Sequence, residues 1–193
     1  MCGRYLFTAG QAEEIRHIAE EIDKKYNAGS WKQGEIFPSA KAPVLLERGG
    51  DIRPELLTWG YRMPKSLVIN ARVETAAEKP LFRESVASGR CVVPSSGFYE
   101  WDGRKRKYLF SLPGDGALYM AGLYSVRDGK PSYVILTTDA NGSMREVHHR
   151  MSLVLPKDQV ASWLTEPEAA DGFLRMTPPE LERTAADGQI RMW

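Results

Sequence analysis

The sequence predicts an α+β fold, with one domain over residues 1–193 built on a curved, barrel-like and mainly antiparallel β core with peripheral helices. Short runs rich in β-branched and aromatic residues fill the middle of the chain, and clusters of glycine, proline and charged residues separate them. Helical periodicity is confined to the two ends and one interruption between strands. With 193 residues, of which 42% are hydrophobic, the chain can bury the core of one domain.

The clearest helix is predicted over residues 11–26, where isoleucines recur at helical spacing and acidic residues favour the N-terminal end. A second helix is predicted over residues 76–88, and the pattern turns helical again after residue 155. Strands are predicted for seven apolar runs, at residues 42–47, 52–60, 67–74, 90–101, 107–112, 118–126 and 132–138.

Charge and cysteine content exclude several classes of protein. The net charge is +1, so binding of nucleic acid has to rest on a local basic patch. Two cysteines, without a Cys-x-x-Cys spacing, make neither a disulfide scaffold nor a zinc site, and we expect no metal and no cofactor. Cys91 lies in the apolar run RCVVP and is interpreted as a small buried hydrophobic residue.

No stretch approaches the ~20 apolar residues that a membrane span needs, and the first 30 residues are too charged for a secretory signal. We therefore expect a cytoplasmic protein, associated with the nucleoid when it binds DNA.

The chain opens MCGRY. If Met1 is removed, Cys2 carries both a free α-amine and a thiol.

Asn70 lies inside LVINARVE, a run that otherwise resembles a buried strand. Alternation along a strand puts Asn70, Arg72 and Glu74 on one polar face. The alternative for Asn70 is a strand-end amide that binds a neighbouring loop.

Glu100 lies between two aromatic residues in GFYEW. A carboxylate in such surroundings requires a partner and suits proton transfer. The alternative is an edge-strand glutamate that pairs with a lysine or arginine.

His148 and His149 are adjacent in REVHHRM, just before a strand-like run. Neighbours on a strand point to opposite sides, so only one histidine is expected to face a shared site. Histidine suits proton transfer near neutral pH. The alternative is a histidine in a surface or packing role.

Basic and aromatic residues accompany these positions. Arg4, Arg72 and Arg150 flank them, and residues 102–107 form a basic turn that suits phosphates or a solvated hairpin tip. Aromatic residues at positions 59, 61 and 101 are suited either to stacking on bases or to core packing.

Six motifs in order carry a resemblance that spans residues 2 to about 155: MCGRY, WGY, INARVET, GFYEW, TTDAN and HHRM. Together they resemble the SOS-response-associated peptidase (SRAP) family. The resemblance departs at two places, where Ser152 stands for the usual proline and EIFPSA replaces the usual segment at residues 35–40.

The resemblance implies a sensor of abasic sites in single-stranded DNA, with crosslinking and lyase-type activity and a positively charged DNA groove on a barrel-like domain. A monomer would suit this task. By motif, Cys2 is the crosslinking residue, Asn70 and Glu100 line the pocket, and the motif register selects His148 as the catalytic histidine. Positions expected to contact or shape the DNA are Gly3, Arg4, Arg72, Trp101, Thr137 and Arg150.

The chemistry of an abasic aldehyde explains why the crosslinking residue would be a cysteine at the N-terminus. A ring-opened abasic sugar exposes an aldehyde, the α-amine captures it as a Schiff base, and the thiol of the same residue closes a five-membered thiazolidine. An α-amine is about 10–20% neutral at pH 7, because its ordinary pKa is about 7.7–8.0. Ring closure is intramolecular, a class of step with effective molarities of ~10⁵ M or more.

Two other functions fit the same residues. An N-terminal-nucleophile cysteine peptidase would use the Cys2 thiol on an amide, with Asn70 as an oxyanion donor. A non-covalent module for damaged DNA would need only Arg72, Arg150 and Trp101. Electrophoresis under denaturing conditions separates the crosslinker from the binding module.

Overall fold

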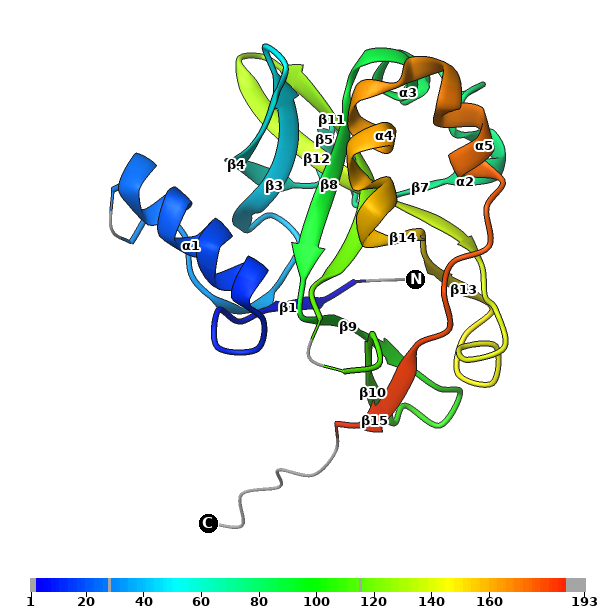
Figure 1. Cartoon of the computed structure of the whole chain (residues 1–193). Coiled ribbons are helices and arrows are strands. Elements are labelled where there is room, and N and C mark those ends of the chain that lie inside the picture. The colour runs from blue at the N-terminus through cyan, green and yellow to red at the C-terminus, as the bar shows by residue number, and fades with distance from the viewer. Residues whose placement is uncertain (1–2, 28, 115, 187–193) are drawn as a thin grey trace.

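The computed structural model describes residues 3–27, 29–114 and 116–186. Five of its strands close into a barrel (Figure 1). Around the ring, β4 (Asp51–Trp59) pairs with β3 (Lys41–Arg48), β3 with β8 (Arg90–Ser95), β8 with β11 (Leu118–Arg127), and β11 with β12 (Lys130–Asp139). The ring closes where β12 pairs with β4 in parallel, and the other four pairings are antiparallel. The expected barrel-like, mainly antiparallel core is confirmed.

Three short strands extend the barrel sheet. The strand β7 (Asn70–Arg72) runs parallel to β12, β13 (Arg150–Ser152) runs antiparallel to it, and β14 (Val154–Leu155) pairs with β11. Both β7 and β13 join β12 beyond the ring, so they surround one end of that strand.

A second sheet lies below the barrel in Figure 1. Its order is β15 (Glu182–Ala185), β10 (Lys107–Ser111), β9 (Gly97–Trp101), β1 (Tyr5–Phe7) and β2 (Gly34–Ile36), with every pairing antiparallel. The chain therefore passes from the barrel to this sheet between β8 and β9.

Helices cover the outside. The predicted first helix is α1 (Glu13–Lys25), which buries three isoleucines and an alanine and packs on β3 and β4. The other helical segments are α2 (Val73–Ala76), α3 (Arg83–Ser88), η1 (Lys157–Gln159), α4 (Val160–Thr165), η2 (Pro167–Ala169) and α5 (Ala170–Leu174). One hydrophobic cluster runs through the barrel, the second sheet and the helices. A single domain over 1–193 stays a prediction, because residues 187–193 lie outside the described residues.

The structure corrects the predicted strand over residues 67–74. The chain first forms a hairpin from β5 (Tyr61–Met63) and β6 (Ser66–Val68), and then enters β7. The break falls at Ile69, whose carbonyl accepts hydrogen bonds from Trp59 Nε1 (3.0 Å) and Ile135 N (3.1 Å). Glu74 consequently belongs to α2, so it does not share a strand face with Asn70.

Two further predictions need correction. The run at 90–101 is two strands, because Ser96 leaves the barrel and donates its N–H to the Leu6 carbonyl of β1 (2.7 Å). The helix predicted over residues 76–88 is interrupted between α2 and α3, where Pro80 lacks the N–H that a continuous helix needs. In the part of the chain that the structure describes, no helix has the length and apolar character to cross a membrane.

Candidate functional site

The end of β12 gathers several of the predicted residues. On one side, β7 places Arg72 opposite Thr137, with Asn70 two residues earlier. On the other side, β13 begins at Arg150, two residues after His148. The structure thus brings together residues that are up to 80 positions apart in the sequence, because both short strands use the same end of one barrel strand.

Glu100 belongs to the second sheet and faces the barrel. It lies on β9, is 3% exposed, and shares a face of the sheet with Tyr5, because Tyr5 lies opposite Phe98 and alternate residues point the same way. The Tyr5 hydroxyl lies 2.7 Å from that of Tyr133 on β12. Glu100 therefore points to the side of the sheet that packs on the barrel.

Three aromatic residues support the junction of the two sheets. The ring of Trp59 lies 5.2 Å from that of Tyr5 and stacks at 6.4 Å on that of Tyr133, and all three side chains are fully buried. The indole N–H of Trp59 also donates to the carbonyl of Ile69, which directly precedes Asn70. The core therefore fixes the start of β7, and Trp59 is a packing residue.

Arg150 is buried and its guanidinium is bound by protein groups. It donates to Glu74 (2.5 and 2.9 Å), to Asp139 (2.6 Å) and to the carbonyl of Thr137 (2.6 Å). Burial alone would lower the pKa of Arg150, but the bonds to the two carboxylates outweigh it and raise that pKa. The hydrogen bond from Arg150 also holds the pKa of Glu74 below its ordinary value. Arg150 therefore ties α2 to β12 and β13, which shapes the site.

His148 and His149 lie in the turn before β13, and their rings stack with centroids 4.5 Å apart. The expectation that they point to opposite sides is wrong, because the chain does not enter a strand until Arg150. His148 is half-buried and His149 is exposed. The backbone N–H of Arg150 donates to Nδ1 of His148 (2.9 Å), which leaves Nε2 to carry the proton of the neutral ring. The Arg150 carbonyl lies 3.1 Å from the same Nδ1, where it accepts a hydrogen bond in the state in which Nδ1 carries the hydrogen.

Exposure separates the remaining predicted residues. Arg72 is exposed, Gly3 is partly exposed, and Thr137 is fully buried with its hydroxyl 3.4 Å from the Ala71 carbonyl. Thr137 is therefore placed to shape the site from beneath. Asn70 is half-buried, and it makes at least one interaction beyond its strand pairing.

A cluster of charged and aromatic residues lies on the outer face of the second sheet. Glu35 binds Arg4 (3.1 Å) and Lys107 (2.7 Å). The Arg4 guanidinium lies 4.3 Å from the ring centroid of Phe37 and 5.3 Å from that of Trp101. Glu35 and Phe37 are not among the residues predicted for the site, although both fall in the segment EIFPSA, where the sequence departs from the family pattern. That departure is the sequence signal that could have pointed to them.

The two cysteines differ in what the structure says of them. Cys91 is fully buried, and burial raises the pKa of its thiol. The interpretation of Cys91 as a buried hydrophobic residue is confirmed, and such a thiol is inert. Cys2, the predicted crosslinking residue, lies outside the described residues.

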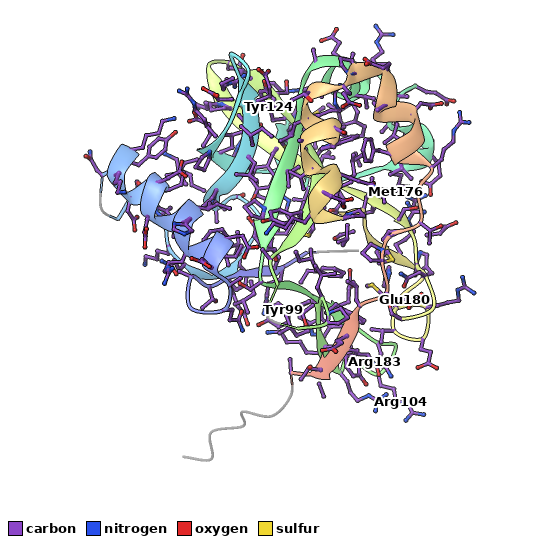
Figure 2. All side chains as sticks on the ribbon, viewed as in Figure 1. Tyr99, Arg104, Tyr124, Met176, Glu180 and Arg183 are labelled. Carbon is purple, nitrogen blue, oxygen red and sulfur yellow. The ribbon has the colours of Figure 1, made fainter. Side chains whose placement is uncertain are left out.

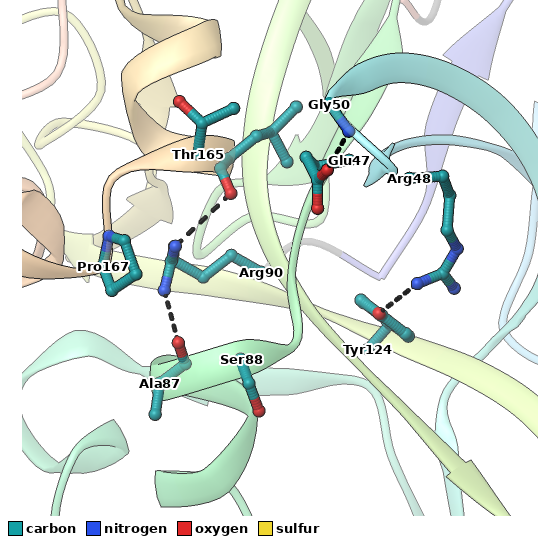
Figure 3. Close-up of a pocket in the computed structure, with 10 residues that line it drawn as sticks. Glu47, Arg48, Gly50, Ala87, Ser88, Arg90, Tyr124, Thr165 and Pro167 are labelled. Atoms are coloured by element: carbon teal, nitrogen blue, oxygen red, sulfur yellow. Dashed lines mark hydrogen bonds between the residues drawn. The ribbon is translucent and has the colours of Figure 1, made fainter.

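A pocket of about 670 Å³ lies away from the candidate site residues. It is lined by β3, β11, α3 and the end of α4 (Figure 3). At its wall Arg90, 6% exposed, donates to the carbonyls of Val86 and Ala87 at the end of α3, and of Trp163 and Leu164 near the end of α4. Since four of its five N–H groups bind helix-end carbonyls, Arg90 stabilises two helix ends.

Comparison with known proteins identifies the family. The family model described as SOS response associated peptidase (SRAP) matches residues 1–187. The abasic site processing protein YoaM of Bacillus subtilis is 30% identical, over 91% of this chain and 84% of its own. YedK of Escherichia coli, named in the same way, is 28% identical over 86% and 80%. A crystal structure of a Bordetella bronchiseptica protein, 24% identical, covers 95% of this chain and 99% of its own with a TM-score of 0.75, which shows the same fold. On this evidence the chain belongs to the SOS response associated peptidase family.

Proposed function

We propose that this protein binds abasic sites in single-stranded DNA and forms a covalent crosslink to the opened sugar through Cys2 after Met1 is removed. The relatives are named as abasic site processing proteins, and the family match includes position 2. The observation that carries the proposal is the hydrogen bond from Tyr99 N–H to the carbonyl of Arg4 (2.9 Å). It ties the backbone two residues after Cys2 to β9, next to Glu100.

The proposed reaction is a condensation. The α-amine of Cys2 adds to the C1′ aldehyde, and the resulting carbinolamine loses one water to give an imine. The thiol then adds across the C=N bond, with sulfur bonding to carbon and the proton going to nitrogen. The ring contains S, Cβ, Cα, N and C1′, and the net change is the loss of one water.

Three side chains are proposed to assist. Glu100 exchanges protons with the amine and the sugar oxygen as the imine forms, since its carboxylate is buried on the barrel side of β9. His148 assists opening of the sugar ring and, in reverse, release of the crosslink. It uses Nε2, because the backbone of Arg150 contacts Nδ1. Asn70 hydrogen-bonds the opened sugar or the amine and orients the aldehyde. Elimination from the imine is the route to a lyase activity.

We assign the proposed DNA contacts from the exposure of each side chain. Arg72 offers an exposed guanidinium to a phosphate, and Arg4 with Trp101 presents a partly exposed cation beside an aromatic ring. Gly3, which has no side chain, allows the DNA strand to approach the protein backbone closely. Thr137 and Arg150 act from beneath by holding β7, α2 and β13 in place.

The test is incubation with a single-stranded oligonucleotide that holds one abasic site, followed by electrophoresis under denaturing conditions. We expect a heat-stable shifted band for the wild type and for Cys91→Ala, and none for Cys2→Ala. Cys91→Ala is the matched control, because it removes the other thiol of the chain. A stable band from Cys2→Ala would contradict the thiazolidine, and free DNA in every lane would indicate a non-covalent module.

A further inference from the structure

The C-terminal segment crosses the turn that carries the histidines. We call residues 176–186 the C-terminal strap and residues 140–149 the histidine loop. Figure 2 shows Met176, Glu180 and Arg183 following one another along the strap, from the helical layer down to β15. The histidine loop lies beside it, and the two are joined by hydrogen bonds at several positions.

Asn141 is the centre of this junction. Its side chain is 7% exposed, and Nδ2 donates to the carbonyls of Pro178 (3.0 Å) and Pro179 (2.9 Å). Its Oδ1 accepts from the N–H (3.2 Å) and the hydroxyl (2.6 Å) of Ser143. All the donors and acceptors of this amide are thus used, two on the strap and two on the loop.

A second link is continuous with the first. The Ser143 hydroxyl accepts the backbone N–H of Leu181 in the strap (3.1 Å). Farther along, Arg183 pairs with Glu146 across the surface (3.1 Å). Leu181 is buried, so the strap is also anchored by packing.

The far end of the strap belongs to the second sheet. As β15 it pairs with β10, and β10 pairs with β9 in a register that sets Tyr108 between Ala185 and Glu100. The strap therefore connects the loop that carries His148 to the sheet that carries Glu100.

The loop is stiff within itself. Its ends are closed by the hydrogen bond from Ala140 N to His149 O (3.0 Å), and His148 N donates to Met144 O (3.0 Å). Met144 is fully buried and Val147 nearly so. The loop therefore keeps its own shape, and the amide of Asn141, together with Ser143 and Glu146, holds it against the strap.

We propose that Asn141 is a positioning residue for His148: through the strap it fixes the imidazole relative to Glu100. This inference rests on the proposed function, in which both side chains exchange protons with one bound sugar. A proton-transfer group must hold hydrogen-bonding distance to its target, and small displacements of such groups cost large factors in rate. The buried amide thus accounts for a motif residue, the asparagine of TTDAN, that the crosslinking chemistry itself does not use.

The test compares four proteins: wild type, Asn141→Ala, His148→Ala and the double variant. We expect Asn141→Ala to slow crosslink formation on abasic single-stranded DNA about tenfold. If Asn141 acts through His148, the same substitution in the His148→Ala background changes the rate less than about twofold. Ser143→Ala, which removes the acceptor of Leu181 N–H, is the second variant and follows the same pattern.

A readout that does not depend on the reaction is the NMR signal of the imidazoles. In Asn141→Ala the His148 ring resonances should shift or broaden, while those of His17 on α1 stay unchanged. Arg90→Met is the control for stability, because Arg90 also donates to several backbone carbonyls but belongs to the pocket wall away from the site. It should lower the melting temperature and leave the crosslinking rate and the His148 resonances unaltered.

The outcomes separate the two proposals. A wild type that forms no crosslink removes the proposed function, and the imidazole signals then still decide whether Asn141 positions His148. The positioning role is overturned if Asn141→Ala slows the reaction equally with and without His148, or if the His148 resonances stay as in the wild type.

Discussion

Two arginines that the sequence treats alike have different environments. Arg72 and Arg150 both match positions expected to contact or shape DNA. Arg72 is exposed, whereas Arg150 is 5% exposed and bound to Glu74, Asp139 and the carbonyl of Thr137. Residue type alone therefore does not divide phosphate contacts from structural cations, because the difference lies in which carboxylates the fold brings near each one.

Substitutions of Arg72 and Arg150 give a matched prediction. Arg72→Ala should weaken binding of single-stranded DNA and lower the slope of log K against log salt by about 0.7, since one phosphate contact is lost. Its stability to urea should stay that of the wild type. Arg150→Ala should lose about 2 kcal/mol of unfolding free energy, because it leaves the buried carbonyl of Thr137 and two carboxylates without their donor. Equal loss of stability in both variants would refute this division.

A second prediction for a single residue concerns Glu100. Glu100→Gln keeps the size of the side chain and removes its acid–base function. Crosslink formation, followed by quenching in denaturant, should slow about 10²-fold, the range for loss of a general acid or base. Circular dichroism should show an unchanged fold. A rate within about twofold of the wild type would exclude proton transfer by Glu100.

The candidate site residues can be proposed from the sequence because polar side chains stand out in apolar runs, as Asn70 and Glu100 do. Their partners cannot. The bond of Arg150 to Glu74 spans 76 positions, and that of Asn141 to Pro178 spans 37. Such pairs arise from the way that strands are ordered in the sheets, and no local pattern carries that order.

At the scale of elements, the strands and the first helix followed from apolar periodicity, and the boundaries failed where the chain changes sheet. The run 90–101 is rich in β-branched and aromatic residues at both ends, and the segment PSSG at 94–97 is the sequence signal that marks the corner at Ser96. The strand β15 was not predicted, because all four of its residues are exposed and no apolar alternation remains to reveal it. Its position depends on pairing with β10 and on the bonds of the strap.

The outer face of the second sheet carries a pH-dependent cluster. Partial burial alone would raise the pKa of Glu35, but the hydrogen bond from Lys107 and the charges of Lys107 and Arg4 outweigh it and leave that pKa below its ordinary value. A lowered folded pKa means that the stabilisation is present above the unfolded pKa of about 4.3 and is lost as pH falls through the folded pKa.

Glu35→Gln should therefore be less stable than the wild type at pH 7, by less than about 1 kcal/mol because the pair is partly exposed. The difference should vanish as the pH falls from about 4.3 to 2. Urea unfolding of both proteins across this range checks it. A difference that stays constant from pH 7 to pH 2 would show that the ion pairs contribute nothing.

For the whole molecule, closure of the barrel depends on close approach at β11. The chain needs glycine at position 122, because a Cβ there would lie 2.9 Å from both Cys91 Sγ and the carbonyl oxygen of Val134. These atoms belong to β8 and β12, the two neighbours of β11 in the ring. A side chain at this point would push apart strands that close the barrel.

Gly122→Ala should consequently lose about 1–3 kcal/mol of unfolding free energy, the cost of overpacking. Gly172→Ala in α5 is the matched control, since nothing lies within 4 Å of a Cβ at that position and alanine favours helix. Its stability should equal or slightly exceed that of the wild type. Thermal unfolding of the pair gives the answer, and a Gly122→Ala protein as stable as Gly172→Ala would disprove the close approach.

The proposed chemistry depends on which residue receives the DNA, and peptide mass spectrometry locates that residue directly. After reaction with an abasic oligonucleotide, trypsin cleaves behind Arg4 and releases residues 2–4 as one peptide. We predict that this peptide lacks Met1 and carries the mass of the oligonucleotide less one water. An adduct on any lysine-containing peptide, or an unmodified N-terminal peptide that still begins with Met1 in the crosslinked protein, would contradict it.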